Sequence, residues 1–285
     1  MPHTDVGMYT GDQVRAYFDE YGEREWGRFE GSTAMRVNLE IHRRFLARLI
    51  QPGDRVLEVG AGPGRFTIQL AELGARVTVV DVSPGQLELN RVKVDEAGWE
   101  AAVEVRELAD VVGLTAFADG AFDAATAYGG PLSYLFERAG DGLGELMRVT
   151  RPGGIVAFSV MSRWGTVHRF LEPILALGRR GLAAENRRVM ETGELRGELA
   201  RVDGMSLPHE CHLFTWPEIE ALLVGRPCDL LDASAAGFLS IRADDTLAGL
   251  SPEEWAEFLD WEEAACRSRG ALDGGNHTLV ALRRR

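Results

Sequence analysis

The stretch that most constrains this chain runs from residue 56 to residue 66, where an apolar run breaks into closely spaced glycines. Residues 56–59 (Val-Leu-Glu-Val) have strand character, glycine stands at positions 60, 62 and 64, and a helical pattern begins at Phe66. This order predicts a strand, a tight turn and a helix. Glycine lets a ligand approach the backbone more closely than a Cβ atom would allow, and the free N–H groups of the following helix point toward such a ligand. We therefore expect a small molecule to bind at this turn.

Strands and helices alternate regularly after the turn. Apolar strands that alternate with helices predict a parallel sheet covered on both faces, which is an α/β fold with a doubly wound, mostly parallel sheet. The expected strands are 76–80, 103–106, 121–127, 155–160, 230–234 and 277–282, and the expected helices are 66–73, 85–97, 143–150, 217–223 and 252–267.

Two segments depart from this alternation. Amphipathic helical patterns occur within 11–50, and the aromatic, charged stretch between them (21–31) is either a surface loop or a lid that folds over the glycine turn. Residues 162–216 are charged and helix-prone, with a short strand expected at 207–214, and so long an insertion predicts a cap that borders the active site. The expected parts are an N-terminal helical lid (1–50), a core that holds the glycine turn (51–161), an inserted cap (162–216) and a C-terminal completion of the sheet (217–285).

Charge and cysteine content narrow the class of partner. The formal net charge of −13 at pH 7 disfavours nucleic acid and anionic membrane surfaces, because both attract basic proteins. The three cysteines are widely spaced and form no C-x-x-C pair, so neither a disulfide framework nor a zinc site is expected. No apolar run approaches the length of a membrane span, and the first nine residues lack the layout of a signal peptide. We therefore expect a soluble cytoplasmic protein with a small-molecule partner that is neutral, zwitterionic or cationic, and the oligomeric state stays open.

The spacing of the glycines separates two kinds of nucleotide site. The dinucleotide fingerprint G-x-G-x-x-G requires glycine at position 65 if it begins at position 60, and glycine at position 67 if it begins at position 62. The chain has Arg65 and Thr67 at those positions. Its pattern is instead E-x-G-x-G-x-G, which disfavours a nicotinamide dinucleotide.

Asp81 ends the next expected strand, about 20 residues beyond the first glycine. A carboxylate at this strand end can accept hydrogen bonds from the two hydroxyls of a bound ribose. The alternative is that Asp81 caps the following helix, but Ser83 followed by Pro84 suits that role better. We therefore expect Asp81 to bind a ribose.

With these features the chain resembles the class I S-adenosylmethionine-dependent methyltransferases over most of its length. Their first motif is similar to V-L-E-V-G-A-G-P-G-R-F (56–66), and their second motif is similar to V-T-V-V-D-V-S (77–83). Three later family elements also have counterparts: the fourth-strand motif at 117–134, the helix and Pro-Gly-Gly turn before the fifth strand at 146–160, and the element before the sixth strand at 214–223. The resemblance implies a Rossmann-like methyltransferase fold, S-adenosylmethionine as the cofactor, and methyl transfer to an oxygen or nitrogen of a small molecule.

The resemblance also implies roles for individual residues. Family members often close an N-terminal helical lid, which implies that Tyr21 and Trp26 lie beside the sulfonium and that Arg36 binds the cofactor carboxylate. Asp110 follows Leu108-Ala109 where the family usually has a Gly-Asp pair, so a shift of this assignment by one residue stays open. The other residues expected at the cofactor are Glu58, Gly60, Ala61 and Gly62 at the methionine portion, Asp81 at the ribose, Val82, Gln86, Asp110 and Val111 near the adenine, and Tyr128 and Gly129 beside cofactor and acceptor.

The reaction itself places few demands on catalytic residues. Methyl transfer is an in-line displacement in which the protein aligns the reacting atoms and excludes water. An amine acceptor need only arrive deprotonated, whereas a hydroxyl usually needs a general base. His209, Cys211 and His212 could suggest a metal site, but alternate residues of a strand point to opposite faces, so we expect no metal. The candidates for a base are His168, His209, His212, Tyr128 and Tyr134, and for each histidine a structural role is the alternative.

Three other functions stay open at this point. A protein methyltransferase would have an open acidic groove in place of an enclosed pocket. A nicotinamide-dependent oxidoreductase would bind reduced nicotinamide dinucleotide despite Arg65. A non-catalytic protein would keep the cofactor fold without turning over any acceptor.

Overall fold

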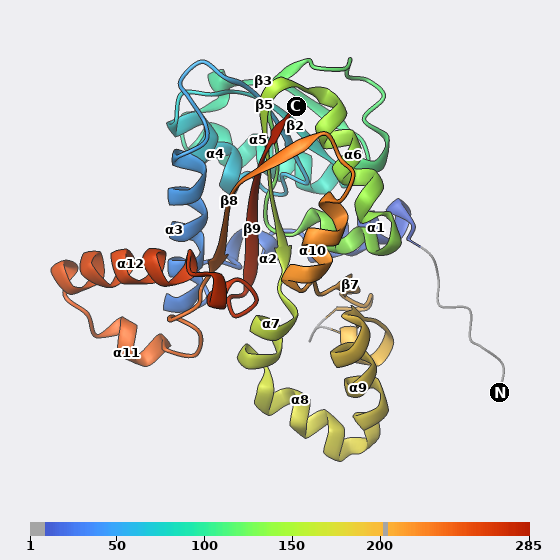
Figure 1. Ribbon diagram of the computed structural model, residues 1–285, viewed down its shortest axis with the longest axis vertical. Helices are drawn as coiled ribbons and strands as arrows, with labels where there is room; N and C mark the ends of the chain where they lie inside the picture. The colour runs from blue at the N-terminus through green and yellow to red at the C-terminus, as the bar shows by residue number, and fades with distance from the viewer. Residues whose placement is uncertain (1–8, 202–204) are drawn as a thin grey trace.

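One seven-stranded sheet forms the centre of the computed structural model, which describes residues 9–201 and 205–285 (Figure 1). The first eight residues of the expected lid therefore lie outside the described part. The strand order is β3-β2-β1-β4-β5-β9-β8. The strands are β1 (Arg55–Val59), β2 (Arg76–Asp81), β3 (Val103–Leu108), β4 (Phe122–Ala127), β5 (Thr150–Met161), β8 (Cys228–Ala236) and β9 (His277–Arg284).

The sheet is mostly parallel, as the sequence predicts. β1 pairs in parallel with both β2 and β4, and β9 is antiparallel to its neighbours β5 and β8. The chain proceeds from β1 toward β2 and β3 on one side and later toward β4 and β5 on the other. The carboxyl end of β1 is therefore the point at which the strand order reverses, and ligands of open α/β sheets bind at such a point.

Consecutive side chains of β1 enter two different cores. Val56 is buried in a cluster with residues of α3, α4 and α12, whereas Leu57 is buried with residues of α6 and α10 on the opposite face. Each such buried aliphatic side chain contributes about 1.5–3 kcal/mol, so β1 is held firmly from both sides. The helices that surround the sheet are α3 (Thr33–Ala47), α4 (Arg65–Glu72), α5 (Pro84–Glu96), α6 (Ala139–Val149), α10 (Trp216–Leu223), α11 (Asp244–Ala248) and α12 (Pro252–Cys266).

The remaining helices belong to the N-terminal segment and to the insertion. α1 (Gly11–Tyr21) and α2 (Arg24–Gly27) precede α3, and α7 (Arg163–Arg169), α8 (Leu171–Leu177) and α9 (Ala183–Thr192) follow directly on β5. Figure 1 shows α7, α8 and α9 projecting beyond the end of β5, away from the sheet. Within the described residues, no helix is long and apolar enough to cross a membrane.

The strand expected at 207–214 is much shorter than the sequence suggests. Only Cys211–His212 forms a strand, β7, which pairs with β6 (Glu194–Leu195). Pro208 makes a single bridge to Arg201. Because proline has no backbone N–H, it cannot extend a hydrogen-bonded ladder from that position.

Candidate active site

The glycine turn at the end of β1 has a backbone that other residues could not adopt without strain. Gly60, Gly62 and Gly64 have φ angles of 66°, 53° and 97°. At Gly60 a Cβ atom would also lie 2.5 Å from Cγ of Pro131. The turn leads into α4 and leaves the surface above it open to a ligand.

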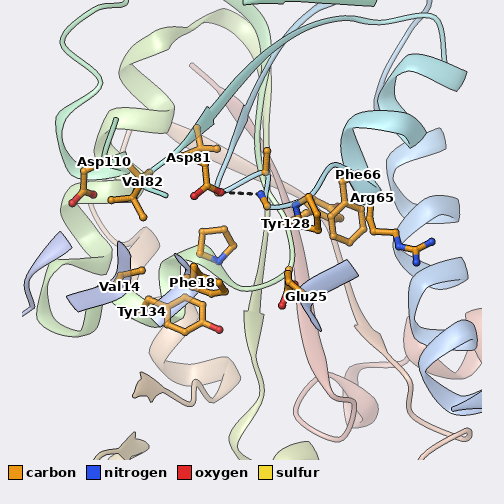
Figure 2. Close-up of a pocket in the computed structure, with 18 of the residues that line it drawn as sticks. Val14, Phe18, Glu25, Arg65, Phe66, Asp81, Val82, Asp110, Tyr128 and Tyr134 are labelled. Carbon is orange, nitrogen blue, oxygen red and sulfur yellow. Dashed lines mark hydrogen bonds between the residues drawn. The ribbon is translucent and has the colours of Figure 1, made fainter. Parts of the chain in front are cut away.

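A cavity lies above this turn and contains about 800 Å³ of space not occupied by atoms, part of it open to solvent. Figure 2 shows Asp81, Val82 and Asp110 on one side of it, with Phe18 and Glu25 of the N-terminal segment opposite. We call it the turn cavity. Nine of the residues expected at the cofactor line it, namely Gly60, Ala61, Gly62, Asp81, Val82, Asp110, Val111, Tyr128 and Gly129.

Asp81 is the last residue of β2 and its side chain is buried. Oδ2 accepts a hydrogen bond from the Gly62 N–H (2.8 Å), and Oδ1 accepts one from the Ser83 N–H (2.9 Å). Burial raises the pKa of Asp81 to about 6, although these N–H groups act in the opposite direction. Ser83 itself caps α5, because its Oγ accepts from the Gln86 N–H (3.0 Å). The cap is therefore Ser83, and Asp81 faces the cavity.

Asp110 lies at the far end of the turn cavity from the glycines. Its Oδ1 accepts from the Val112 N–H (3.1 Å), and its Oδ2 accepts from the Tyr9 hydroxyl (2.6 Å). The second bond joins the beginning of the described chain to the segment that follows β3. Asp110 therefore lines the cavity and anchors the N-terminal segment at the same time.

Glu58 lies behind the turn and does not line the cavity. It shares a face of β1 with Val56 and therefore points toward α4, where its Oε2 accepts from the Thr67 hydroxyl (2.6 Å). Its Oε1 is buried and has no hydrogen-bond partner among the described residues. Burial raises the pKa of Glu58 to about 8, so the carboxyl is mostly protonated at pH 7. The structure places Glu58 under the turn and outside the lining of the cavity.

The N-terminal segment is docked across the turn cavity by hydrogen bonds to α5 and α4. Gln86 Nε2 donates to the carbonyls of Phe18 (3.0 Å) and Gly22 (3.2 Å), so Gln86 holds α1 and does not line the cavity. Arg65 Nη2 donates to the carbonyl of Trp26 (2.8 Å). These contacts place part of the 21–31 stretch over the glycine turn.

Three residues expected at the cofactor from this segment lie elsewhere. The Trp26 ring stacks on the Arg65 guanidinium, 3.6 Å from the ring centroid to Cζ, and is not part of the cavity lining. Arg36 is exposed on α3, where its Nη2 donates to Thr33 Oγ1 (3.1 Å). Tyr21 lines a second cavity. Two arginines, Arg28 and Arg65, line the turn cavity. Arg65 is held by the Trp26 carbonyl, and the sequence reasoning did not place Arg28 at the cofactor.

Arg28 lies where two cavities meet. Its Nη2 is 3.1 Å from Glu25 Oε1, and both residues line the turn cavity. Arg28 also lines the second cavity, which contains about 1800 Å³ of space not occupied by atoms and lies under the inserted helices. We call this the cap cavity. Most of its lining is apolar, including Met35, Met161, Val167, Ile174, Val189, Met190, Leu195, Leu199 and Leu213.

Of the three candidate histidines, only His209 lines either cavity. Its Nδ1 lies 2.5 Å from the Tyr17 hydroxyl, and its Nε2 lies 3.3 Å from the Tyr134 hydroxyl. Tyr134 lines the turn cavity and His209 lines the cap cavity, so this contact spans the wall between them. Burial lowers the pKa of His209 to about 4, which leaves the ring neutral at pH 7 and makes it a weaker base than an exposed histidine.

The other candidate bases lie in less suitable places. His168 is exposed on α7, and His212 Nε2 lies 3.6 Å from Glu218 Oε1; neither lines the two cavities. Tyr128 lines the turn cavity, but burial raises its pKa well above the ordinary value. Its hydroxyl has no hydrogen-bond partner among the described residues.

Comparison with known proteins gives a consistent result. A family model described as a methyltransferase domain matches residues 56–154. The demethylmenaquinone methyltransferase of Clavibacter sepedonicus is 34% identical over 184 residues, which cover 64% of this chain and 67% of that protein. A ubiquinone biosynthesis O-methyltransferase of Xanthomonas campestris pv. campestris is 32% identical over 120 residues, and there the match covers 41% of this chain and 47% of the relative. Among solved structures, the cyclase SpnF has a similar fold, with a TM-score of 0.61 at 17% identity over 98% of both chains.

Proposed function

The chain belongs to the class I S-adenosylmethionine-dependent methyltransferases, and we propose that it transfers a methyl group from S-adenosylmethionine to an oxygen or nitrogen atom of a small organic acceptor. The observation that supports this most is the meeting of two cavities at Arg28. The turn cavity has the glycine turn and Asp81 and would hold the cofactor. The larger and mostly apolar cap cavity would hold the acceptor.

The residues of the turn cavity fit the cofactor. Each oxygen of the Asp81 carboxylate accepts one backbone N–H and keeps a lone pair for a ribose hydroxyl. When bound, S-adenosylmethionine supplies a methyl group that is already activated on a sulfonium. Val82 and Val111 offer apolar surface to the adenine.

The Glu25–Arg28 pair is placed to bind the charged end of the cofactor. A Cβ atom built on Gly62 would lie 3.8 Å from Cγ of Glu25. A Cβ atom built on Gly129 would lie 3.0 Å from Nη2 of Arg28. We infer that Glu25 pairs with the ammonium of the methionine portion and Arg28 with its carboxylate, because opposite charges inside a cavity are screened less than at the surface. Arg28 thereby takes the role that the sequence suggests for Arg36.

Calorimetric titration tests the cofactor assignment. S-adenosylhomocysteine should bind the wild-type protein, and reduced nicotinamide dinucleotide should not. Arg28→Met should weaken S-adenosylhomocysteine binding by about tenfold or more, because a charge-assisted bond to the carboxylate is lost. Arg36→Met is the matched control and should bind as the wild type does. Binding of the nicotinamide dinucleotide alone would favour the oxidoreductase, and an effect of Arg36→Met equal to that of Arg28→Met would contradict the assignment.

We infer that His209 accepts the proton of a hydroxyl acceptor. The neutral ring touches Tyr134, so a proton released in the turn cavity can reach His209 Nε2 through that hydroxyl. His209→Gln should lower turnover of phenolic acceptors by about tenfold to a hundredfold, which is below or at the low end of the usual 10²–10⁴-fold, because its pKa of about 4 lies below the working pH. Aryl amines should react at the wild-type rate, since they arrive deprotonated. The measurement is transfer of a labelled methyl group from S-adenosylmethionine to a panel of phenols and anilines, and equal losses for both classes would exclude this role.

The cap cavity favours a small acceptor over a protein. A protein methyltransferase was expected to have an open acidic groove. Among the described residues, the lining of the cap cavity includes neither aspartate nor glutamate. The inserted helices α7 to α9 also supply much of that lining.

A further inference from the structure

The cap cavity differs in charge from the molecule as a whole. The chain has 44 acidic and 31 basic residues. The described lining of the cap cavity nevertheless contains the three arginines Arg28, Arg169 and Arg201 and no acidic residue. His209 lines the same cavity and is neutral at pH 7 because burial lowers its pKa to about 4. This cavity therefore attracts anions, whereas the net charge of the protein repels them.

Two of these arginines already have partners. Arg28 pairs with Glu25 (3.1 Å). Arg201 Nε lies 3.7 Å from Glu198 Oε1, and its Nη1 donates to the Ser206 carbonyl (3.0 Å). Arg28 is already assigned to the cofactor carboxylate, and Arg201 is held by Glu198 and Ser206, so neither is the first choice to bind an acceptor.

Arg169 has no such partner in the part of the chain that the structure describes. It is half-buried at the end of α7, and its Nη1 contacts only Met35 Sδ (2.7 Å), a weak acceptor. Its Cζ lies 5.2 Å from the centre of the Phe170 ring. Burial lowers the pKa of Arg169 from its usual value; the Asp244 carboxylate acts in the opposite direction and Arg28 in the same direction as burial, but no carboxylate of the described residues forms an ion pair with Arg169.

Other shielded arginines of the same insertion do have carboxylate partners. Arg163 Nη2 lies 2.6 Å from Glu218 Oε1, and Arg196 Nε lies 3.3 Å from Glu194 Oε2. A guanidinium inside an apolar cavity is costly unless an anion compensates it. The difference at Arg169 therefore indicates a counterion that comes from outside the chain.

We propose that the acceptor is an organic anion, with an apolar aromatic or alicyclic body in the cap cavity and an acid group bound by Arg169. The proposal rests on the proposed function, because it names the class of acceptor for that same site. The apolar lining, which includes Met161, Ile174 and Leu213, covers the body of such a molecule. The planar guanidinium offers two parallel N–H donors to a carboxylate or sulfonate. The wall made by Tyr134 and His209 is left for the atom that receives the methyl group.

Two fluorescent probes with the same aromatic skeleton test the proposal. 8-Anilinonaphthalene-1-sulfonate carries a sulfonate, and N-phenyl-1-naphthylamine lacks it. Arg169→Met should weaken binding of the sulfonate probe by about tenfold or more and change binding of the neutral probe by less than about twofold. Arg180→Met removes a charge from an exposed arginine of the same insertion and should leave both affinities as in the wild type. An unchanged affinity for the sulfonate probe, or equal losses for both probes, would overturn the proposal.

Two further measurements separate this proposal from its premise. Arg169→Lys keeps the charge and should retain most of the affinity for the sulfonate probe. This variant tests whether the charge at position 169 binds the acid group even if Arg169→Met folds poorly. S-adenosylhomocysteine binding should be the same in the wild type and in Arg169→Met. Failure of the wild type to bind S-adenosylhomocysteine would remove the proposed function, whereas selective loss of the sulfonate probe in Arg169→Met would still establish the anion site.

Discussion

Asp81→Ala should weaken the binding of S-adenosylhomocysteine by about a hundredfold or more, measured by calorimetry at pH 7. Two hydrogen bonds from ribose hydroxyls to the carboxylate are lost, each worth about 1.5–3 kcal/mol, and tenfold in affinity corresponds to about 1.4 kcal/mol. The substitution also removes the acceptors of the Gly62 and Ser83 N–H groups, which hold the turn in place. An affinity equal to that of the wild type would exclude Asp81 as the ribose ligand.

The pH dependence of the same titration separates the carboxylate from general damage. Because burial raises the pKa of Asp81 to about 6, its ionised fraction falls about tenfold between pH 7 and pH 5. The ionised form accepts both hydroxyls, so wild-type affinity should fall by about tenfold as the pH decreases over this range. Glu58, with a pKa of about 8, stays protonated throughout. In Asp81→Asn the affinity should be low and should change less with pH than in the wild type, with a residual change from Glu25, whose pKa burial also raises.

Asp123→Ala provides a matched control for Asp81→Ala. Asp123 lies near the start of β4, at the end of the sheet opposite the cavity, where its Oδ1 lies 2.7 Å from Arg151 Nε. Loss of this exposed ion pair should leave cofactor affinity unchanged. A comparable loss of affinity in both variants would mean that the effect of Asp81→Ala arises from the sheet and not from the ribose.

Local sequence signals were sufficient for the turn and its nearest neighbours. The positions of Gly60, Gly62 and Asp81 follow from the strand–turn–helix order, because residues close in sequence form the turn and the adjacent strand end. Ser83 is the N-cap of α5 for an equally local reason. The alternation of strands and helices also predicted the mostly parallel sheet, since strands buried on both faces have continuous apolar runs.

Contacts between distant segments were not predictable from the sequence. Both Arg28 and Arg36 lie in the N-terminal segment, and the choice between them depends on how α1 docks on α5 through Gln86, whose partners Phe18 and Gly22 are more than sixty residues away. His209 meets Tyr17 across 192 residues. The order of residue types does not show which distant segments come into contact. The sequence alone therefore could not decide which of the three histidines lies at the site.

The orientation of Glu58 was a further feature that the sequence reasoning did not anticipate. The family resemblance implied that Glu58, two residues before Gly60, contacts the ligand. In the structure Glu58 lies on the face of β1 that packs on α4, and its carboxyl accepts a hydrogen bond from the Thr67 hydroxyl. The period of two in a strand would have placed Glu58 on the same face as Val56, and Val56 is buried in the core.

Glu262→Ala should have the largest effect on stability, a loss of about 3–5 kcal/mol in the free energy of unfolding. Glu262 is fully buried on α12, and its carboxylate accepts from the N–H groups of Phe238 (2.5 Å) and Ser240 (3.0 Å) and from the Cys266 thiol (3.2 Å). Alanine would leave these donors buried without an acceptor, and each bond to a charged group contributes about 1.5–3 kcal/mol. Urea denaturation of the two proteins measures the difference.

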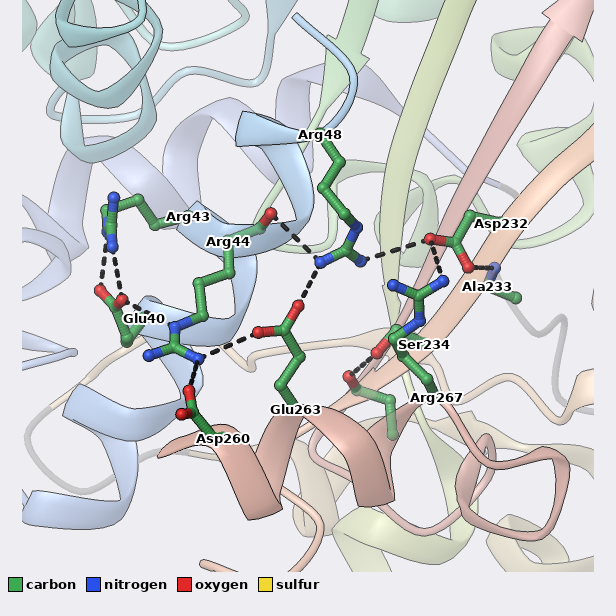
Figure 3. A network of polar contacts seen from close by, with 11 residues as sticks. Glu40, Arg43, Arg44, Arg48, Asp232, Ala233, Ser234, Asp260, Glu263 and Arg267 are labelled. Carbon is green, nitrogen blue, oxygen red and sulfur yellow. Dashed lines mark hydrogen bonds and ion pairs between the residues drawn. The ribbon is translucent and has the colours of Figure 1, made fainter. Parts of the chain in front are cut away.

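The next residue along the helix is the natural control. Glu263 joins a network between α3, α12 and β8 (Figure 3), in which it contacts Arg44 Nη1 (3.0 Å) and Arg48. These groups are partly exposed, and such ion pairs are usually worth about 0–1 kcal/mol, so Glu263→Ala should cost about 1 kcal/mol or less. High salt should reduce that small effect and leave the effect of Glu262→Ala unchanged, because solvent ions screen only accessible charges. Equal losses in the two variants would mean that the surface network, and not the buried turn at 237–240, holds α12 against the sheet.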